Sequence, residues 1–239
     1  MRLSDYYEIS QAPDRESFER RLVGFANEMD FELISAALVV DGPGRDSVFV
    51  MLGNTPQAFA NAARDVDASR RDPVLRRMKG MGAPFVYDQS TYVDDGAADL
   101  WEEQAVFGYR TGVSMALHLP GGRHFLMGVD RARDLPTDDD RITSMMADLQ
   151  IMEVHAQDAA VRLLLDEAQR RLDLPRLTAR EREVLRWTSE GKSAWEVSVI
   201  LGMSEHTVNF HLRNLMAKLD VTSKHQAVLK AMSLGLIES

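Results

Sequence analysis

The chain has 239 residues, which is enough for two domains that each bury a hydrophobic core. It contains no cysteine, no apolar run of membrane-spanning length and no signal-peptide pattern in MRLSDYYEIS, so we expect a cytoplasmic protein without disulfides, thiolate chemistry or a metal site. Residues 1–175 carry 19 Lys and Arg against 30 Asp and Glu, whereas residues 176–239 carry nine against seven, so nucleic-acid binding is expected only in the last quarter.

The first 172 residues have the helical and extended patterns of an α+β sensor domain. Helical periodicity predicts a helix at Arg15–Met29, and β-branched apolar runs predict strands at Phe31–Val40 and Ser47–Leu52. Helices that flank an antiparallel sheet leave room for an enclosed small-molecule pocket. A phosphoacceptor receiver would instead begin with a strand and alternate strands with helices, so that class is set aside. The remaining predicted elements are helices at Gln57–Arg64, Pro73–Lys79 and Asp138–Leu172, and strands at Gly112–His118 and His124–Val129.

A linker at residues 173–176 precedes an all-α domain of four short helices at residues 177–239. Thr178 and Glu181 form the capping box of the first helix, and Ser193 and Glu196 form that of the second. Gly202 can end the second helix because glycine readily adopts a left-handed backbone. The predicted buried faces are Val184, Leu185 and Thr188 in the first helix and Val197, Ile200 and Leu201 in the second.

The third helix of this domain is predicted to begin at Ser204 and to have one apolar and one polar face. Two helices joined by a tight turn form a helix-turn-helix, whose second helix lies in the major groove of DNA. Arg213 can bind guanine and Asn209 can bind adenine, each through two hydrogen bonds. A helical bundle with a solvated polar face is the alternative. The predicted buried stripe is Val208, Leu212, Leu215 and Leu219, and the predicted DNA-binding residues are Ser204, His206, Thr207, Asn209, His211, Arg213, Asn214 and Lys218.

This domain resembles the LuxR-type helix-turn-helix over about sixty residues. The resemblance implies DNA binding as a dimer through the third helix, with the fourth helix forming part of the dimer interface. Ala227, Met232 and Leu236 are then expected either at that interface or in the core of one subunit. The motifs that carry the resemblance are Leu177-Thr178, Arg180-Glu181, Glu183-Val184-Leu185, Gly191-Lys192, Glu196-Val197, Ser204, Thr207-Val208, His211, Asn214, Lys218-Leu219 and Leu234-Gly235-Leu236-Ile237.

The preceding domain resembles, more weakly, the autoinducer-binding domain of LuxR-type quorum-sensing receptors. That family binds an N-acyl homoserine lactone between the sheet and its helices, and an aspartate before a proline accepts a hydrogen bond from the ligand amide. Asp72 stands at this position, although an aspartate before Pro73 is also a common helix cap. The motifs that carry the resemblance are Asn54-Thr55-Pro56, Asp72-Pro73, Trp101-Glu102-Glu103-Gln104-Ala105, Gly108 and Gly112.

Several positions depart from that family. Thr55 replaces a tyrosine, and Phe59 replaces a tryptophan whose indole N–H donates to the lactone carbonyl, which a phenyl ring cannot do. Ala63 replaces a second tyrosine, Tyr87 replaces a second tryptophan, and Gly128 replaces a small hydroxyl residue. Either another group compensates for the lost donor or the ligand is different. The candidate replacements are Tyr87, Ser114, Tyr92 and Ser35, and each could equally be an ordinary core or rim residue.

The remaining wall of the predicted cavity is apolar. It is expected to comprise Leu75, Leu100, Trp101, Val113, Met115 and Met127, a set that suits an acyl or aryl tail and would equally form a core without ligand.

We therefore expect a dimeric transcription factor that binds a small autoinducer of the acyl- or aryl-homoserine lactone class and an inverted-repeat site in double-stranded promoter DNA. RNA polymerase is a further expected partner. The alternative is an orphan regulator that senses a non-lactone metabolite or acts without ligand, which the changes at Thr55, Phe59 and Ala63 motivate. An enzyme is not expected. The histidines His118, His124 and His155 are isolated in the sequence, and the chain has neither a nucleophile motif nor paired carboxylates.

Overall fold

The computed structural model describes residues 2–42, 47–56, 70–172 and 175–237. The chain divides into two compact units. One contains Met1–Val39, Phe49–His118 and His124–Ala168, and the other contains Gln169–Ser239 with the short segments Val40–Val48 and Leu119–Arg123. We describe the sheet-containing unit and the C-terminal helical unit separately. The predicted helix at Gln57–Arg64 and the first half of the predicted linker lie outside the described residues.

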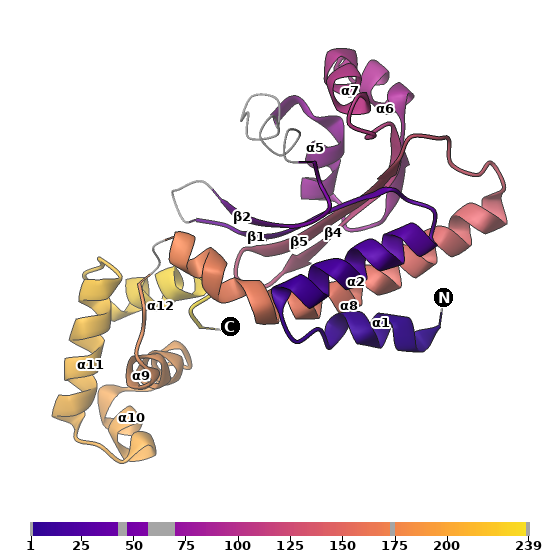
Figure 1. The fold of residues 1–239 in the computed structure, drawn as a ribbon. Coiled ribbons are helices and arrows are strands. Elements are labelled where there is room, and N and C mark those ends of the chain that lie inside the picture. Colours follow the sequence, from indigo (N-terminus) through magenta and orange to yellow (C-terminus); the bar gives the residue numbers. More distant parts are fainter. Residues whose placement is uncertain (1, 43–46, 57–69, 173–174, 238–239) are drawn as a thin grey trace. The chain divides into compact units, whose positions relative to one another are not determined.

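The larger unit is built around a five-stranded antiparallel sheet (Figure 1). Its strands follow the order β2-β1-β5-β4-β3, so the last two long strands lie between the first strand and a short edge strand. The edge strand pairs antiparallel with its neighbour, with Tyr87 opposite Gly112 and Phe85 opposite Ser114. The strands are β1 (Leu33–Val40), β2 (Val48–Gly53), β3 (Phe85–Tyr87), β4 (Thr111–Leu119) and β5 (Arg123–Arg131).

Helices cover both faces of this sheet (Figure 1). On one face lie α1 (Leu3–Ser10), α2 (Arg15–Glu28) and the long α8 (Asp139–Arg171). On the other lie α5 (Pro73–Gly80), α6 (Gln89–Asp94) and α7 (Ala98–Ala105). The predicted α+β class is confirmed, and every predicted element within the described residues is present. The elements α1, β3, α6 and α7 were not predicted, because each has eight residues or fewer and therefore shows little periodicity.

Alternation along β4 and β5 separates the two cores. Ala116 on β4 and Leu126 on β5 belong to the apolar cluster formed with α5, α6 and α7. Because successive strand residues point to opposite faces, Met115 and Met127 point to the face covered by α1, α2 and α8. Both methionines are completely buried there.

The helix α8 is attached to the N-terminal helices by polar contacts as well as by packing. The Tyr6 hydroxyl donates to Asp148 at 2.5 Å, and the Arg162 guanidinium donates to the Ser10 and Ala12 carbonyl oxygens at 2.8 Å. His155 stacks on Tyr6 with a ring separation of 6.0 Å.

The expectation that the histidines are isolated is wrong for two of them. The Nδ1 atoms of His118 and His124 lie 2.8 Å apart, because β4 and β5 form a hairpin that brings these distant positions side by side. No group of three or more His, Cys, Asp or Glu side chains able to hold a metal ion occurs among the described residues.

The C-terminal unit contains the four predicted helices, α9 (Ala179–Ser189), α10 (Ala194–Leu201), α11 (Glu205–Lys218) and α12 (Lys224–Ser233). Both capping boxes are present: the Thr178 hydroxyl accepts from the Glu181 amide at 3.2 Å, and the Ser193 hydroxyl accepts from the Glu196 amide at 3.3 Å. Gly202 has φ of 63°, the left-handed conformation that ends α10. These local signals fix where each helix begins and ends.

The predicted stripe of α11 is the centre of this unit's core. Val208, Leu212, Leu215 and Leu219 are all buried, as are Val184 and Leu185 of α9 and Val197 of α10. Ile200 was predicted to be buried and is 43% exposed, so that prediction is wrong. The helix α10 is only eight residues long and turns Val197 and part of Leu201 toward the core, which leaves Ile200 on its outer side.

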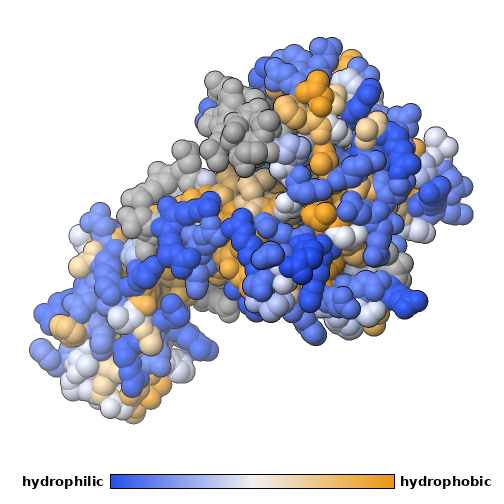
Figure 2. All heavy atoms as spheres, viewed as in Figure 1, coloured by the Kyte–Doolittle hydropathy of each residue, from blue (hydrophilic) through white to orange (hydrophobic). Residues whose placement is uncertain are grey.

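The outer surface in the view of Figure 2 is mostly hydrophilic, with scattered apolar side chains. No described helix has the length and apolar character needed to cross a bilayer.

Candidate functional site

Asp72 is the N-cap of α5 and lies in the core beneath it. Its Oδ1 atom accepts hydrogen bonds from the Val74 and Leu75 amides at 2.8 and 3.0 Å, and Pro73 occupies the first helical position. The capping role considered from the sequence is therefore present. A cap uses only one of the two carboxylate oxygens, which leaves Oδ2 available for another partner.

The Oδ2 atom of Asp72 is directed at two side chains from α6 and α7. The Gln104 amide donates to it at 2.9 Å, and the Tyr92 hydroxyl lies 3.5 Å from it. Tyr92 also donates to the Gln104 side-chain oxygen at 3.0 Å. The resemblance implies that Asp72 accepts a hydrogen bond from a ligand amide, and in this structure the Gln104 side-chain amide donates to that carboxylate.

A second buried carboxylate lies on the same face of the sheet. Asp130, near the end of β5, is 2% exposed and accepts a hydrogen bond from the Tyr87 hydroxyl. Tyr87 lies across from Gly112, where a Cβ atom would stand 2.7 Å from the Tyr87 hydroxyl oxygen. Gly112 therefore creates the space in which this tyrosine reaches the carboxylate.

The third polar group joins β1 to the segments before α5 and β4. The Ser35 hydroxyl lies 2.8 Å from the Thr55 hydroxyl and 3.1 Å from the Tyr109 hydroxyl. Tyr109 is buried and lies close enough to Asp130 for the aspartate charge to act on it. Hydroxyl and carboxyl groups from several separate segments of the chain thus lie near one another.

Burial and mutual repulsion set the protonation of this cluster. Burial raises the pKa of Asp130 to about 7; the Tyr87 hydrogen bond opposes the rise and the nearby Asp72 charge adds to it. Burial also raises the pKa of Tyr87 and Tyr92, with the carboxylates of Asp130 and Asp72 as further causes, so both phenols remain neutral. The cluster therefore contains neutral donors arranged around two carboxyl groups.

Some of the predicted ligand-binding residues lie in the apolar cluster beside the polar groups, one of them with its hydrogen-bond donor already used, and others lie outside the described residues. Leu100 is buried in the cluster with Tyr87 and Tyr92, and Leu75 packs against it. Trp101 also packs there, but its indole N–H donates to the Arg110 carbonyl at 3.1 Å and is not free for a ligand. Phe59 and Ala63 lie outside the described residues.

Met127 was predicted to line the cavity, as were Val113 and Met115. All three point to the opposite face of the sheet from Ser114 and Gly128, so they belong to the other core. The error arose because an apolar run that is buried on both faces conceals the strand's alternation.

Three residues of this polar cluster were not singled out as site residues from the sequence, namely Gln104, Tyr109 and Asp130. The predicted strand ended at Val129, whereas β5 continues to Arg131 and turns Asp130 inward beside Gly128. Asp130 lies two residues after Gly128, so strand alternation places both residues on the same face of the sheet. That spacing was the signal that could have identified Asp130.

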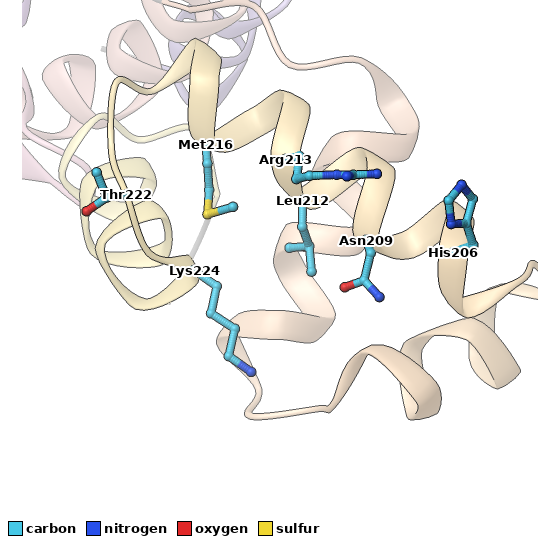
Figure 3. A pocket seen from close by; sticks show the side chains of 7 residues that line it. All are labelled: His206, Asn209, Leu212, Arg213, Met216, Thr222 and Lys224. Carbon is cyan, nitrogen blue, oxygen red and sulfur yellow. The ribbon is translucent and has the colours of Figure 1, made fainter.

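The polar face of α11 forms the second candidate site. His206, Asn209 and Arg213 are exposed on this face, and with Lys224 at the start of α12 they line one groove (Figure 3). The groove also contains Leu212, Met216 and Thr222. Its three basic side chains and one amide are hydrogen-bond donors suited to phosphates and to base edges.

The other predicted DNA-binding residues are less available. The Ser204 hydroxyl caps α11 by accepting from the Thr207 amide at 3.1 Å, and it lies 2.8 Å from the Thr207 hydroxyl, so the two hydroxyls are bonded to each other. His211 and Asn214 are half-buried at the edge of the polar face. They flank the groove rather than line it.

Lys218 was predicted to bind DNA and instead forms an ion pair inside the unit. Its Nζ atom donates to Glu181 Oε2 at 2.7 Å and to the Arg176 carbonyl at 3.2 Å. Burial opposes ionisation of Glu181, but the bonds from Lys218 and Thr178 prevail and hold its pKa below the usual value. The Lys218 charge thus holds the end of α11 to the start of α9.

The fourth helix contributes to the core of this subunit. Ala227 is completely buried within the chain, and Met232 and Leu236 pack partly buried against the same core. Ala227 is therefore accounted for by burial inside one subunit, which was the second of the two expectations for it.

Two family models match the chain. The autoinducer binding domain matches residues 14–160, and the family of bacterial regulatory proteins called the luxR family matches residues 175–231. The two matches correspond to the sheet-containing unit and the helix-turn-helix.

Relatives with known names agree with these matches. The chain is 29% identical over 232 residues to the transcriptional activator protein SolR of Ralstonia nicotianae, covering 97% of both chains. It is 34% identical over 169 residues to the HTH-type quorum sensing-dependent transcriptional regulator RpaR of Rhodopseudomonas palustris, covering 70% of this chain and 66% of RpaR. It is 32% identical over 190 residues to y4qH of Sinorhizobium fredii, named as an HTH-type transcriptional regulator, and spans 56% of that longer relative and 77% of itself.

The fold is also that of a solved structure. SdiA in complex with octanoyl-rac-glycerol is 26% identical and superposes with a TM-score of 0.72, covering 99% of this chain and 95% of SdiA. Each unit therefore has both a sequence and a structural counterpart among regulators rather than enzymes. The chain belongs to the luxR family of bacterial transcriptional regulators, with an autoinducer-binding domain followed by a helix-turn-helix DNA-binding domain.

Proposed function

We propose that this chain is a cytoplasmic, homodimeric regulator whose domain at residues 1–172 binds an N-acyl homoserine lactone or a related amphipathic signal. Its domain at residues 177–239 then binds an inverted-repeat promoter site, and the bound regulator contacts RNA polymerase there. The observation that carries the proposal is the buried polar cluster around Asp72, beneath the helices that match the autoinducer-binding domain. A signal that binds only the folded sensor domain shifts the folding equilibrium toward the folded state. The stabilised chain then forms the proposed dimer and binds the promoter.

Support for an amphipathic ligand comes from the composition of the cluster. Its polar groups lie beside an apolar set that includes Val74, Met78 and Leu100, so a molecule with a polar end and a hydrocarbon tail would find partners for both. The relative SdiA was solved with octanoyl-rac-glycerol, which has this construction.

Support for DNA binding comes from the groove on α11. Arg213 and Asn209 are exposed one above the other on the helix that a helix-turn-helix inserts into the major groove. His206 and Lys224 lie at the two ends of the same groove and can bind phosphates.

The test combines thermal unfolding with DNA binding. The full chain is heated with and without acyl- and aryl-homoserine lactones, and Asp72→Asn is heated in parallel. A rise in melting temperature that depends on the acyl chain and weakens in Asp72→Asn supports the proposal, as does tighter binding to a duplex selected from a randomised library when the active lactone is present. A protein whose unfolding and DNA binding do not respond to any lactone contradicts it.

A second function is favoured by one observation. Gln104 already donates to Asp72 Oδ2, so the carboxylate has a protein partner for its burial. An orphan regulator that binds DNA without a lactone would have this property. A well-folded dimer that binds its selected duplex unaided supports this second function.

A further inference from the structure

Ser114 and Asp130 both lie close to Gly128, where any larger side chain would crowd them. A Cβ atom built at Gly128 would lie 3.1 Å from the Ser114 hydroxyl oxygen and 3.9 Å from Asp130 Oδ2. Ser114 and Asp130 are each 2% exposed, so both polar atoms are withdrawn from bulk water. They come from the adjacent strands β4 and β5 and lie on the sheet face that also carries Tyr87.

The hydrogen-bonding capacity at this point is not fully used. Tyr87 donates to Oδ1 of Asp130, whereas Oδ2 is the oxygen on the side of Gly128 and Ser114. Within the described part of the chain, the Ser114 hydroxyl has no hydrogen bond. The other hydroxyls of the cluster are engaged, since Ser35 contacts Thr55 and Tyr109, and Tyr92 contacts Gln104. Buried polar atoms normally have partners, so this pair is suited to a bound molecule.

The chemistry of Asp130 decides which molecule suits it. Burial raises the pKa of Asp130 to about 7 and the Tyr87 hydrogen bond opposes that rise, so above pH 7 the group is mostly an ionised carboxylate, which only accepts hydrogen bonds. A ligand carbonyl placed against Oδ2 would bring two acceptors together. A ligand hydroxyl or ammonium would donate to Oδ2 and accept from, or donate to, the Ser114 hydroxyl.

We propose that Asp130 and Ser114 form a second polar contact for the signal and select a head group that donates hydrogen bonds over a lactone carbonyl, which can only accept them. This inference rests on the proposed binding of a signal in this domain and names the chemical class of its head group. It assigns a recognition role to Asp130.

Three compounds with the same eight-carbon acyl amide test the inference. N-octanoyl homoserine lactone has a head that only accepts, N-octanoyl ethanolamine has a hydroxyl donor, and N-(2-aminoethyl)octanamide has an ammonium donor. Dissociation constants are measured by calorimetry and melting temperatures by scanning at pH 8, above the Asp130 pKa of about 7, so that the aspartate is mostly ionised. The proteins are the wild-type full chain, Asp130→Asn, Ser114→Ala, Asp72→Asn and the exposed-aspartate control Asp140→Asn.

The expected result is a preference of about tenfold or more for the better donor-bearing compound over the lactone in the wild type and in Asp140→Asn. Asp130→Asn retains an oxygen for Tyr87 and gains an N–H donor, so its preference is expected to shift toward the lactone. Ser114→Ala is expected to weaken the donor-bearing compound and to change lactone binding little.

Equal affinity of the wild type for all three compounds, or a preference for the lactone, overturns the inference. If the lactone still raises the melting temperature and Asp72→Asn weakens that effect, the proposed signal-binding function survives this failure. No binding of any of the three compounds to the wild type overturns the inference and also removes the support for signal binding in this domain. Because the comparison among compounds uses the wild type, it stands even if a variant fails to fold.

Discussion

The Gln104 side-chain amide donates to Asp72 Oδ2 at 2.9 Å, while Asp72 Oδ1 caps α5. One carboxylate therefore joins α5 to α7. Its role in stability and its proposed role in recognition can be separated by choosing the replacement.

Asp72→Ala and Asp72→Asn should differ in stability and agree in their weakened ligand response. Alanine removes the cap, at about 1 kcal/mol, and leaves the Gln104 amide unpaired at a further ~1–3 kcal/mol. Asparagine keeps an oxygen for the Val74 and Leu75 amides and should lose less. Urea unfolding with and without N-octanoyl homoserine lactone measures both effects. Equal stability of the two variants would show that the cap contributes nothing.

Glu153 should make the protein less stable as the pH rises. This carboxyl on α8 is completely buried, and neither of its oxygens has a hydrogen-bond partner among the described residues. Burial raises its pKa from 4.5 to about 8, so the folded protein holds a proton that the unfolded chain releases. The free energy of unfolding should therefore fall between about pH 4.5 and 8, by at most ~1.4 kcal/mol per pH unit.

Glu153→Gln should flatten that dependence, and the exposed Asp158→Asn on the same helix should not. Asp130, with its pKa raised by burial from 3.8 to about 7, acts in the same direction, so part of the slope should remain below pH 7. Urea unfolding at half-unit pH steps gives the profiles. Parallel profiles for the wild type and Glu153→Gln would contradict the assignment.

Lys218→Met should destabilise the helix-turn-helix without reducing the salt dependence of DNA binding. The substitution leaves Glu181, whose side chain is 4% exposed, without its ammonium partner at 2.7 Å. The cost should be about 1–3 kcal/mol in urea unfolding, since Lys218 itself is partly solvated. Glu181→Met in addition should recover part of the loss. A stable Lys218→Met protein with a smaller salt slope would instead make this lysine a phosphate contact.

Arg213→Ala should weaken DNA binding and relax base preference. Arg213 is exposed in the groove of α11, and a guanidinium that binds guanine through two hydrogen bonds contributes about 1–3 kcal/mol of discrimination. Binding is measured on duplexes that the wild type selects from a randomised library. Arg186→Ala, which removes an exposed arginine from α9, serves as the control. Unchanged affinity and sequence preference in Arg213→Ala would reject this face as the one that reads bases.

Gly112→Ala should disrupt the Tyr87–Asp130 contact. The new Cβ atom would stand 2.5 Å from the Val129 carbonyl oxygen and 2.7 Å from the Tyr87 hydroxyl, so strand and ring must both shift. The expected loss of stability is about 1–3 kcal/mol. Gly24→Ala in α2 meets no atom within 4 Å and should instead stabilise the protein by ~0.5–1 kcal/mol. Thermal unfolding of the two variants compares them directly, and a neutral Gly112→Ala would mean that the ring has other room.

Local signals in the sequence were sufficient for the helix-turn-helix. The caps at Thr178 and Ser193, the left-handed Gly202 and the four-residue stripe of α11 each act within one or two turns of helix, and all are present in the structure. The long strands and α8 were likewise predicted from their own periodicity. The polar face of α11 was visible for the same reason, because a helix determines which of its residues share a side.

The sequence by itself thus determined the two domains' fold classes, the cap positions in the helix-turn-helix domain and the exposed face of α11. Only the tertiary structure decided that Lys218 pairs with Glu181, that Gln104 satisfies Asp72, that Met127 lies in the opposite core and that Asp130 faces Tyr87. The two members of each bonded pair are between 32 and 43 residues apart in the sequence. They meet because of the order of the strands in the sheet and the packing of the helices. The pairs are Lys218 with Glu181, Gln104 with Asp72, and Tyr87 with Asp130. Hydrogen bonding and burial depend on such distant contacts, whereas capping and periodicity depend on neighbours along the chain.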